Sequence, residues 1–308
     1  MRVTELETGR NLLTDLEKLN RNFADVNRQL SSGKKLNKLS DSPLGSADLV
    51  YITQEALRLD AYRFNIIESK YKLSSADTAL NEMNNAFTRF FTLGSNAANE
   101  STNKEGRESI LSEMEILREQ LVALANTQVD GNYIFAGTNV NEQPFKLVKA
   151  GDPLHTGLHE TETVYTGNTN VISIPVGDGV LVKASVDGKT AFEDVFKKVD
   201  DIIAAVKGSI YGTGTVEGIG TALEGFGDSL NTLSQARGQV GISLSMVERM
   251  SSIIAARDVV LTTQRSHIED ANALEVAVRI NQLQTAVNAA LSSGGAILKQ
   301  NTLFDIIG

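Results

Sequence analysis

Apolar residues near the start of the chain recur at alternating steps of four and three residues. They are Leu12, Leu16, Leu19, Phe23, Val26 and Leu30. This heptad spacing keeps one apolar stripe of a helix turned toward a partner helix. Ser31, Ser32 and Gly33 follow directly, and glycine readily takes the left-handed conformation that ends a helix. We therefore predict an N-terminal helix that stops near residue 33 and packs along one stripe.

A second and longer apolar pattern begins after Asp41, Ser42 and Pro43, where a capping side chain precedes a proline suited to the first helical turn. Its apolar positions recur every seven residues, at Ile52, Leu59, Ile66, Leu73, Leu80 and Phe87. Neither glycine nor proline interrupts residues 46–93. A helix of about 50 residues is roughly 75 Å long, which is too long for a compact globular domain. The pattern predicts an elongated helical rod.

The rest of the chain alternates between helical and β-type patterns. Helical spacing returns over residues 110–124, 192–206 and 223–254. Residues 130–188 hold glycine-rich turns and short β-branched runs, and we expect Asp187 and Gly188 to form a tight hairpin turn. Glycines in residues 208–220 indicate a flexible linker. The last apolar series alternates steps of four and three again. Two of its residues, Ala290 and Gly294, are small and would let a neighbouring helix approach closely. The series is Val276, Ile280, Leu283, Val287, Ala290, Gly294 and Ile297.

These patterns predict a mainly α fold with a β-rich insertion. Long antiparallel helices form a folded-back rod, the N- and C-terminal heptad helices pair with each other, and a small β domain lies in the middle. We expect three domains. They are a terminal coiled-coil assembly domain of residues 1–40 and 270–308, a helical rod domain of residues 41–130 and 190–269, and a β-rich outer domain of residues 131–189.

Composition limits the chemistry that the chain can perform. Its 308 residues include no cysteine, no tryptophan and three histidines. This excludes disulfides and thiol chemistry and disfavours a polyhistidine metal centre. The net charge of −9 argues against a nucleic-acid coat, and no apolar run has the length of a membrane span. We expect no enzyme activity, no cofactor, no bound metal and no membrane or nucleic-acid partner.

Individual candidate residues add little chemistry. His155 and His159 stand four residues apart, but Gly151, Pro153 and Gly157 argue against a helix there, and no third metal ligand is evident. The glycines of residues 212–220 lack the preceding strand of a nucleotide-binding loop. The two terminal stripes leave two alternatives open, since they fit either a helical bundle within one chain or contacts between subunits.

Short motifs carry a resemblance to a known family. Residues 30–35, followed by residues 40–43, resemble the N-terminal signature of the flagellins and their relatives, and residues 264–271 resemble the C-terminal one. Residues 131–138, with Pro144 and Phe145, resemble the family of hook-associated protein 3 more than filament flagellin. The motif residues are Ser31, Ser32, Gly33, Asp41, Gly131, Asn132, Phe135, Gly137, Arg265, Ile268, Glu269 and Asp270.

This resemblance implies a structural subunit of the bacterial flagellum. Such a subunit leaves the cell through the flagellar type III channel without a cleaved signal peptide, and a cytoplasmic export chaperone holds its C-terminal segment. It forms a ring with copies of itself at the hook–filament junction, between a neighbouring hook-associated protein and flagellin. The resemblance also favours contacts between subunits for the terminal stripes, that is, for Leu12, Leu16, Leu19, Phe23, Val26, Leu30, Val276, Ile280, Leu283, Val287, Ala290 and Ile297.

Two other functions stay open at this point. The chain could be a flagellin-like filament subunit, or a flagellin-like frame whose central insertion is adhesive or enzymatic. No constellation of residues in the sequence supports an enzymatic insertion.

Overall fold

The computed structural model describes residues 2–38, 40–156 and 158–299. The chain divides into two compact units. The first unit combines residues 1–58 with residues 256–308, and the second comprises residues 59–255. The mainly α fold with a small β-rich region is confirmed, whereas the three-domain division stays a prediction.

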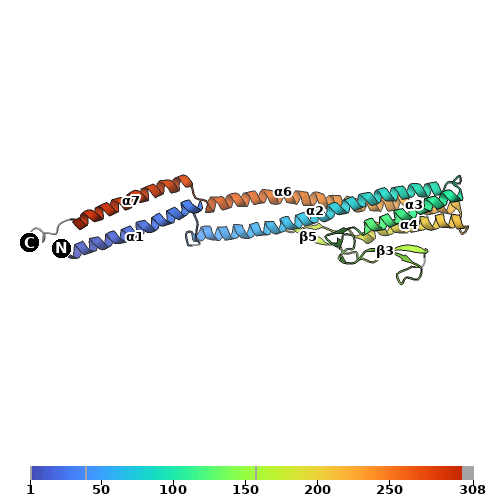
Figure 1. Cartoon of the computed structure of the whole chain (residues 1–308), viewed down its shortest axis with the longest axis horizontal. Helices are drawn as coiled ribbons and strands as arrows, with labels where there is room; N and C mark the ends of the chain where they lie inside the picture. Colours follow the sequence, from blue (N-terminus) through green and yellow to red (C-terminus); the bar gives the residue numbers. More distant parts are fainter. Residues whose placement is uncertain (1, 39, 157, 300–308) are drawn as a thin grey trace, which may run out of the picture. The chain divides into compact units, whose positions relative to one another are not determined.

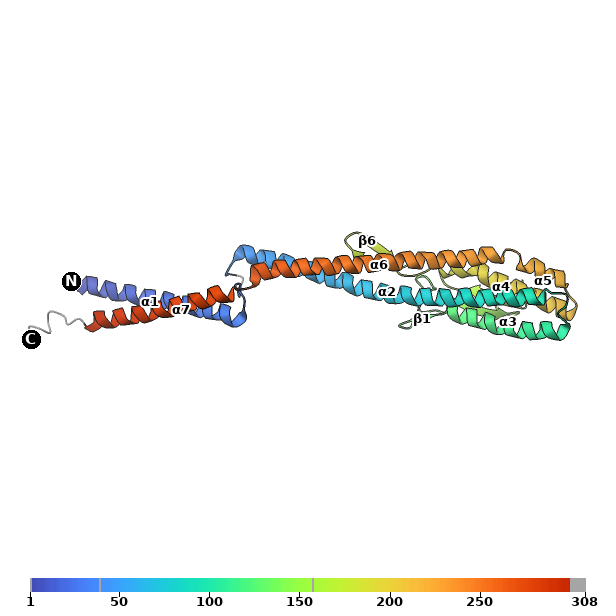
Figure 2. The ribbon, with the colours of Figure 1, turned by 90° about the horizontal axis from the view of Figure 1, so that it is seen from above.

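The first unit is helical and is built from both ends of the chain. It contains α1 (Arg2–Ser32), α7 (Ala273–Lys299), the beginning of α2 (Pro43–Ala97) and the end of α6 (Phe226–Glu269). Helices α1 and α7 lie side by side (Figures 1 and 2). The predicted end of α1 is confirmed, because Gly33 follows the helix in the left-handed region with φ of 70°.

The second unit is organised around the rest of α2 and α6. Every seventh residue of α2 is buried, from Leu59 to Phe87, as the heptad pattern predicted. The seam of α6 is likewise buried at Leu233, Val240 and Val247. At one end of this unit the ring of Phe226 stacks on that of Phe87 with their centroids 4.0 Å apart. The matching periods let the two helices pack along their whole shared length in this unit.

The second unit also contains two more long helices and three small hairpins. The helices are α3 (Lys104–Ala125) and α4 (Gly188–Tyr211). Each hairpin is a separate two-stranded antiparallel sheet. The strands are β1 (Gln128–Val129) with β2 (Asn132–Tyr133), β3 (Phe145–Lys149) with β4 (Thr161–Tyr165), and β5 (Ser173–Gly177) with β6 (Val180–Lys183). Buried phenylalanine rings of the β region pack against α4, so this region shares a core with the helices.

Two local predictions were wrong. Asp187 and Gly188 do not form a hairpin turn, because Asp187 caps the start of α4 and its side chain accepts a hydrogen bond from the N–H of Lys189. The hairpin turn lies earlier, between β5 and β6, where Gly179 has a φ of 70°. The expected flexible linker of residues 208–220 contains the start of a short helix, α5 (Val216–Leu223), capped by Thr215.

Candidate assembly interface

The terminal stripes predicted from the sequence lie between α1 and α7 of the same chain. Val26 and Val276 are buried, and most other stripe residues are half-buried: Leu12, Leu16, Leu19, Phe23, Ile280, Leu283, Val287 and Ala290. Leu30 departs from this pattern and is 46% exposed. The side chain of Ile297 lies outside the described residues. Most of the apolar stripe surface that we expected to contact neighbouring subunits therefore packs between α1 and α7 of one chain.

Gly294 of α7 lies close to Leu12 of α1. A Cβ atom on this residue would lie 2.8 Å from Cδ2 of Leu12, which is closer than real Cβ contacts. A larger residue here would require the Leu12 side chain to move, and the expected role of a small residue stays a prediction.

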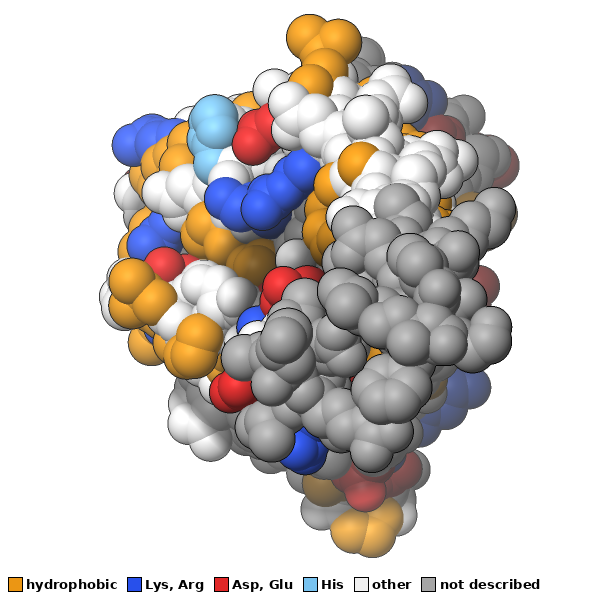
Figure 3. Space-filling model, turned by 90° about the vertical axis from the view of Figure 1, so that its left-hand side faces the viewer, with side chains coloured by type: hydrophobic (Ala, Val, Ile, Leu, Met, Phe, Trp, Pro, Cys, Tyr) orange, Lys and Arg blue, Asp and Glu red, His pale blue; other side chains and the backbone are white. Residues whose placement is uncertain are grey.

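The opposite faces of the pair expose other apolar side chains. Leu13 on α1 is 63% exposed, and on α7 Leu274, Val278 and Leu291 are 76%, 50% and 58% exposed. In the view of Figure 3, hydrophobic side chains reach the surface at several places among charged ones, outside the grey atoms. Because soluble monomers rarely expose extended apolar surface, these faces are candidates for contact with other chains.

The two terminal family motifs meet through their backbones. The N–H of Lys35 donates to the carbonyl of Glu269 over 2.6 Å, and the N–H of Ala271 donates to the carbonyl of Gly33 over 2.9 Å. Lys34 and Asp270 form the antiparallel bridge between these bonds. We call this pairing of residues 33–35 with 269–271 the clasp. It connects the turn after α1 to the turn before α7.

Side chains of the same motifs close around Glu269. Its carboxylate accepts hydrogen bonds from Nζ of Lys34 over 2.5 Å and from Nε of Arg265 over 2.7 Å. These two cations hold the pKa of Glu269 below its usual value. Ser266 donates a hydrogen bond to the carboxylate of Asp270. Motif residues that lie far apart in the sequence therefore form one ionic cluster.

Asp41 and Ile268 position the chain on either side of the clasp. The Asp41 carboxylate accepts hydrogen bonds from the N–H of Lys38 over 2.8 Å and of Asn37 over 3.0 Å, and both bonds lower its pKa. Gly45 lies against Leu36 and Ile268, because an added Cβ would stand 2.9 Å and 3.5 Å from their side-chain atoms. These contacts fix the turn that leads from α1 into α2.

The central family motif shapes the β region rather than a binding site. Gly131, with φ of 79°, lies in the two-residue turn that joins β1 to β2, next to Asn132. Phe135 is fully buried and packs edge-on against Phe192 with centroids 4.8 Å apart. At Gly137 a Cβ would lie 2.2 Å from the carbonyl oxygen of Asn168, so only glycine fits. The motif therefore allows close approach of loops to one another.

The two histidines of the central loop bind protein groups and show no metal arrangement. The Nε2 atom of His155 lies 2.6 Å from the carbonyl oxygen of His159, and Nε2 of His159 lies 2.9 Å from the carboxylate of Asp201. Within residues 2–38, 40–156 and 158–299, no cluster of three or more metal-ligating side chains occurs. Over the same ranges, no helix has the length and apolar character needed to cross a membrane.

Two buried carboxylates near these histidines were not expected from the sequence. Burial raises the pKa of Glu162, but hydrogen bonds from Thr156, His159 and Leu158 outweigh that effect and lower it to about 2. Asp200 is also buried, and burial raises its pKa to about 6 despite the guanidinium of Arg118 at 3.5 Å. Asp200 connects α4 to β4 by accepting a hydrogen bond from the N–H of Thr163, whereas Glu162 holds the loop between β3 and β4.

Comparison with known proteins defines the family. The model of the bacterial flagellin N-terminal helical region matches residues 5–140, and that of the C-terminal helical region matches residues 223–300. These matches contain the terminal motifs and the helices that the clasp connects. The two family matches, together with relatives that are structural flagellar proteins and not enzymes, define a helical structural protein of the bacterial flagellum. The chain belongs to the bacterial flagellin family.

Individual relatives include both hook-associated proteins and flagellins. Flagellar hook-associated protein 3 of Escherichia coli (strain K12) is 26% identical over 280 residues, which covers 85% of this chain and 86% of the relative. Among solved structures, a candidate flagellar hook-associated protein of Vibrio parahaemolyticus has a TM-score of 0.66 at 18% identity, covering 75% of this chain and all of the other. The flagellar junction protein of Legionella pneumophila has a TM-score of 0.57 at 14% identity, covering 72% of this chain and 99% of the other. The two structures share the fold of this chain.

Proposed function

We propose that this chain is the subunit that joins the flagellar hook to the filament. The observation that carries this proposal is the similarity to hook-associated protein 3, which is 26% identical over 280 residues. It covers 85% of the chain, and therefore reaches into the segment between the two matched flagellin regions. A flagellin of Listeria monocytogenes is similar over almost as much of the chain, at 24% identity over 264 residues, so the preference for hook-associated protein 3 rests on its higher identity over a longer stretch.

The terminal unit supplies the assembly surface in this proposal. Most helical stability in proteins comes from packing of an apolar face, so α1 and α7 stabilise each other through their stripes. The exposed apolar residues on their outer faces, such as Leu13 and Leu274, then contact neighbouring copies in a ring. Part of the free energy of binding between copies offsets the cost of ordering α1 and α7. The free subunit therefore binds other copies more weakly and does not assemble early.

The proposed partners follow from this position in the flagellum. Along the axis the ring contacts a neighbouring hook-associated protein on one side and flagellin on the other. The chain reaches this place through the flagellar type III export channel, without a cleaved signal peptide. A cytoplasmic chaperone binds the C-terminal segment before export and keeps its apolar stripe from pairing.

Deleting the gene and examining the cells tests the junction role. We expect hooks without filaments and flagellin released into the medium, and a plasmid copy of the gene should restore filaments. Filaments that still form on the hooks of the deletion strain would refute the proposal.

A filament subunit is the second candidate, because both matched family regions are those of flagellin itself. The two functions differ in how far the purified protein polymerises. Added to flagellin seeds, a filament subunit should extend them into long fibres, whereas a junction subunit should stop at short rings or stay monomeric. Long fibres made of this chain alone would favour the filament role.

A further inference from the structure

The apolar stripes of α1 and α7 have the same spacing and align along the antiparallel pair. One contact marks the alignment, since Leu12 of α1 lies against Gly294 of α7. Both helices rise 1.5 Å per residue, so each step along α1 corresponds to an equal step back along α7. Counted from this contact, the stripe residues face each other as Leu12 with Gly294, Leu16 with Ala290, Leu19 with Val287, Phe23 with Leu283, Val26 with Ile280, and Leu30 with Val276.

The stripes alone do not make this register unique. After a slip of seven residues most stripe positions are level again: Val26 would face Val287 after a slip in one direction, and Leu19 would face Ile280 after a slip in the other. Apolar contacts are non-directional, so the stripes discriminate weakly between these registers. Between the described residues of α1 and α7, no ion pair or side-chain hydrogen bond adds to the choice.

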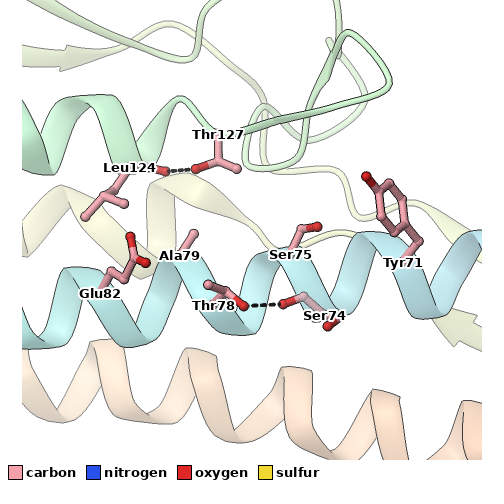
Figure 4. A pocket seen from close by; sticks show the side chains of 8 residues that line it. All are labelled: Tyr71, Ser74, Ser75, Thr78, Ala79, Glu82, Leu124 and Thr127. Carbon is pink, nitrogen blue, oxygen red and sulfur yellow. Dashed lines mark hydrogen bonds between the residues drawn. The ribbon is translucent and has the colours of Figure 1, made fainter.

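The second unit fixes the register of its helices with polar contacts. Arg237 of α6 donates hydrogen bonds to Asp77 and Asn81 of α2 over 2.9 and 2.7 Å. Helix α3 provides a further neighbour, and Figure 4 shows its Leu124 across a shallow groove from Ala79 of α2. Contacts of this kind are specific to one alignment. The pair of α1 and α7 needs another device.

The clasp distinguishes the registers, because it joins the two helices at one end. Gly33 directly follows α1, and its carbonyl accepts the hydrogen bond from Ala271, two residues before α7. In the same place Nζ of Lys34 reaches the carboxylate of Glu269 over 2.5 Å. A slip of seven residues would move Gly33 and Lys34 by about 10 Å along the pair and break all of these bonds. A single register therefore satisfies both the stripes and the clasp.

The covalent connections leave α1 room to slip. Helix α7 follows α6 after only residues 270–272, whereas residues 33–42 connect α1 to α2. A segment as long as the latter extends by up to about 3.3 Å per residue, so it can span a further 10 Å. The connection between α1 and α2 thus does not by itself hold α1 in place.

We propose that the clasp selects the register in which α1 and α7 pair, with Lys34 and Glu269 as the residues that determine it. The inference goes beyond the proposed function and applies to a junction subunit and a filament subunit alike. The register matters for assembly, because a slip would move the exposed Leu13 by about 10 Å relative to the exposed Leu274. A neighbouring molecule would then meet a different surface.

Cysteine pairs in the purified full chain measure the register, because the natural chain contains no cysteine. Two aligned pairs face each other in the structure: Leu19→Cys with Val287→Cys, and Val26→Cys with Ile280→Cys. The same positions provide two crossed pairs, Leu19→Cys with Ile280→Cys and Val26→Cys with Val287→Cys, which become level only after a slip. A disulfide requires Cβ atoms about 4 Å apart, and the crossed pairs are separated by about 10 Å along the axis. Mass spectrometry of the oxidised monomer quantifies the bonds formed within one chain.

With the natural clasp, the aligned bonds should exceed the crossed bonds by about tenfold or more. Lys34→Glu places a carboxylate opposite Glu269, and the ratio should fall by about tenfold, the factor that corresponds to losing one hydrogen bond between charged groups. Lys34→Arg keeps the positive charge and should keep the ratio. The matched control is Lys18→Glu, which makes the same change at an exposed lysine of α1 away from the clasp and should leave the ratio as it is.

Three results would overturn the inference. The first is a natural clasp with which crossed bonds form as readily as aligned ones, and the second is an unchanged ratio in Lys34→Glu. Circular dichroism supplies the third, because it separates a slip from melting of the pair. A Lys34→Glu chain that loses helical signal together with its aligned bonds would show that the clasp stabilises the pair without selecting its register.

Discussion

The buried carboxyl of Asp200 should make the second unit more stable in mild acid than at neutral pH. Its pKa rises from the ordinary value of 3.8 to about 6 in the folded protein, because burial disfavours the charged form. The folded state therefore holds this proton more tightly than the unfolded chain does. Its contribution to stability is complete below pH 3.8 and is lost as the pH rises through about 6.

The size of the effect follows from these two pKa values. Between pH 7 and pH 4.5 the unfolding free energy should rise by about 2 kcal/mol from this carboxyl alone. Glu162 has the opposite sign, because its pKa of about 2 lies below the ordinary 4.5. Its stabilisation is complete well above pH 4.5 and is lost as the pH falls from about 4.5 to about 2, so between pH 7 and pH 4.5 it decreases by only about 0.4 kcal/mol and offsets a small part of the effect of Asp200.

Urea unfolding at several pH values between 4.5 and 7 measures this dependence in the natural chain and in Asp200→Asn. The variant should lose about 2 kcal/mol of the pH-dependent change, whatever its stability at pH 7. The exposed carboxyl of Asp194 on the same helix provides the matched control, and Asp194→Asn should keep the full dependence. An Asp200→Asn protein with an unchanged pH dependence would show that this carboxyl titrates like an exposed one, and the reasoning would fail.

Three further changes test other parts of the fold. Leu283→Asp puts a charge between α1 and α7, so it should leave the circular dichroism of the second unit intact and abolish incorporation into flagella; a motile strain would contradict the role of the stripe. Phe226→Ala removes a stacked ring and should lower the unfolding free energy by about 3–5 kcal/mol in urea titrations. Gly137→Ala should destabilise the chain by more than Gly131→Ala, because both glycines have positive φ but only Gly137 lies against the Asn168 backbone; equal losses would exclude the clash.

Heptad patterns made the long helices predictable. The uninterrupted pattern of residues 46–93 corresponds to α2 (Pro43–Ala97), and the buried residues fall where the seven-residue period placed them. The period works here because the two long helices run side by side, and each apolar position repeats the environment of the one before. Sequence reasoning also found the residues that pair α1 with α7, although it favoured contacts between chains over contacts within one chain.

Other features depend on information that local patterns do not contain. Helix α5 was missed because Gly218 and Gly220 conceal its helical spacing, although Thr215 offered a capping signal. The clasp joins residues about 235 positions apart, so only the family motifs pointed to both of its sides. Nothing in the local sequence of α3 distinguishes Arg118 from a surface arginine. It is buried because α4 packs over it, and there it forms an ion pair with Asp200.

The assembly of the first unit from both ends of the chain has a consequence for the order of events after synthesis. Residues 59–255 separate its two halves, so neither half can complete the unit alone. When one end of the chain is present without the other, the hydrogen bond between the N–H of Ala271 and the carbonyl of Gly33 cannot form. Closing so long a loop costs little more than closing one of half the length. The terminal unit can therefore form only when both ends of the chain are present together.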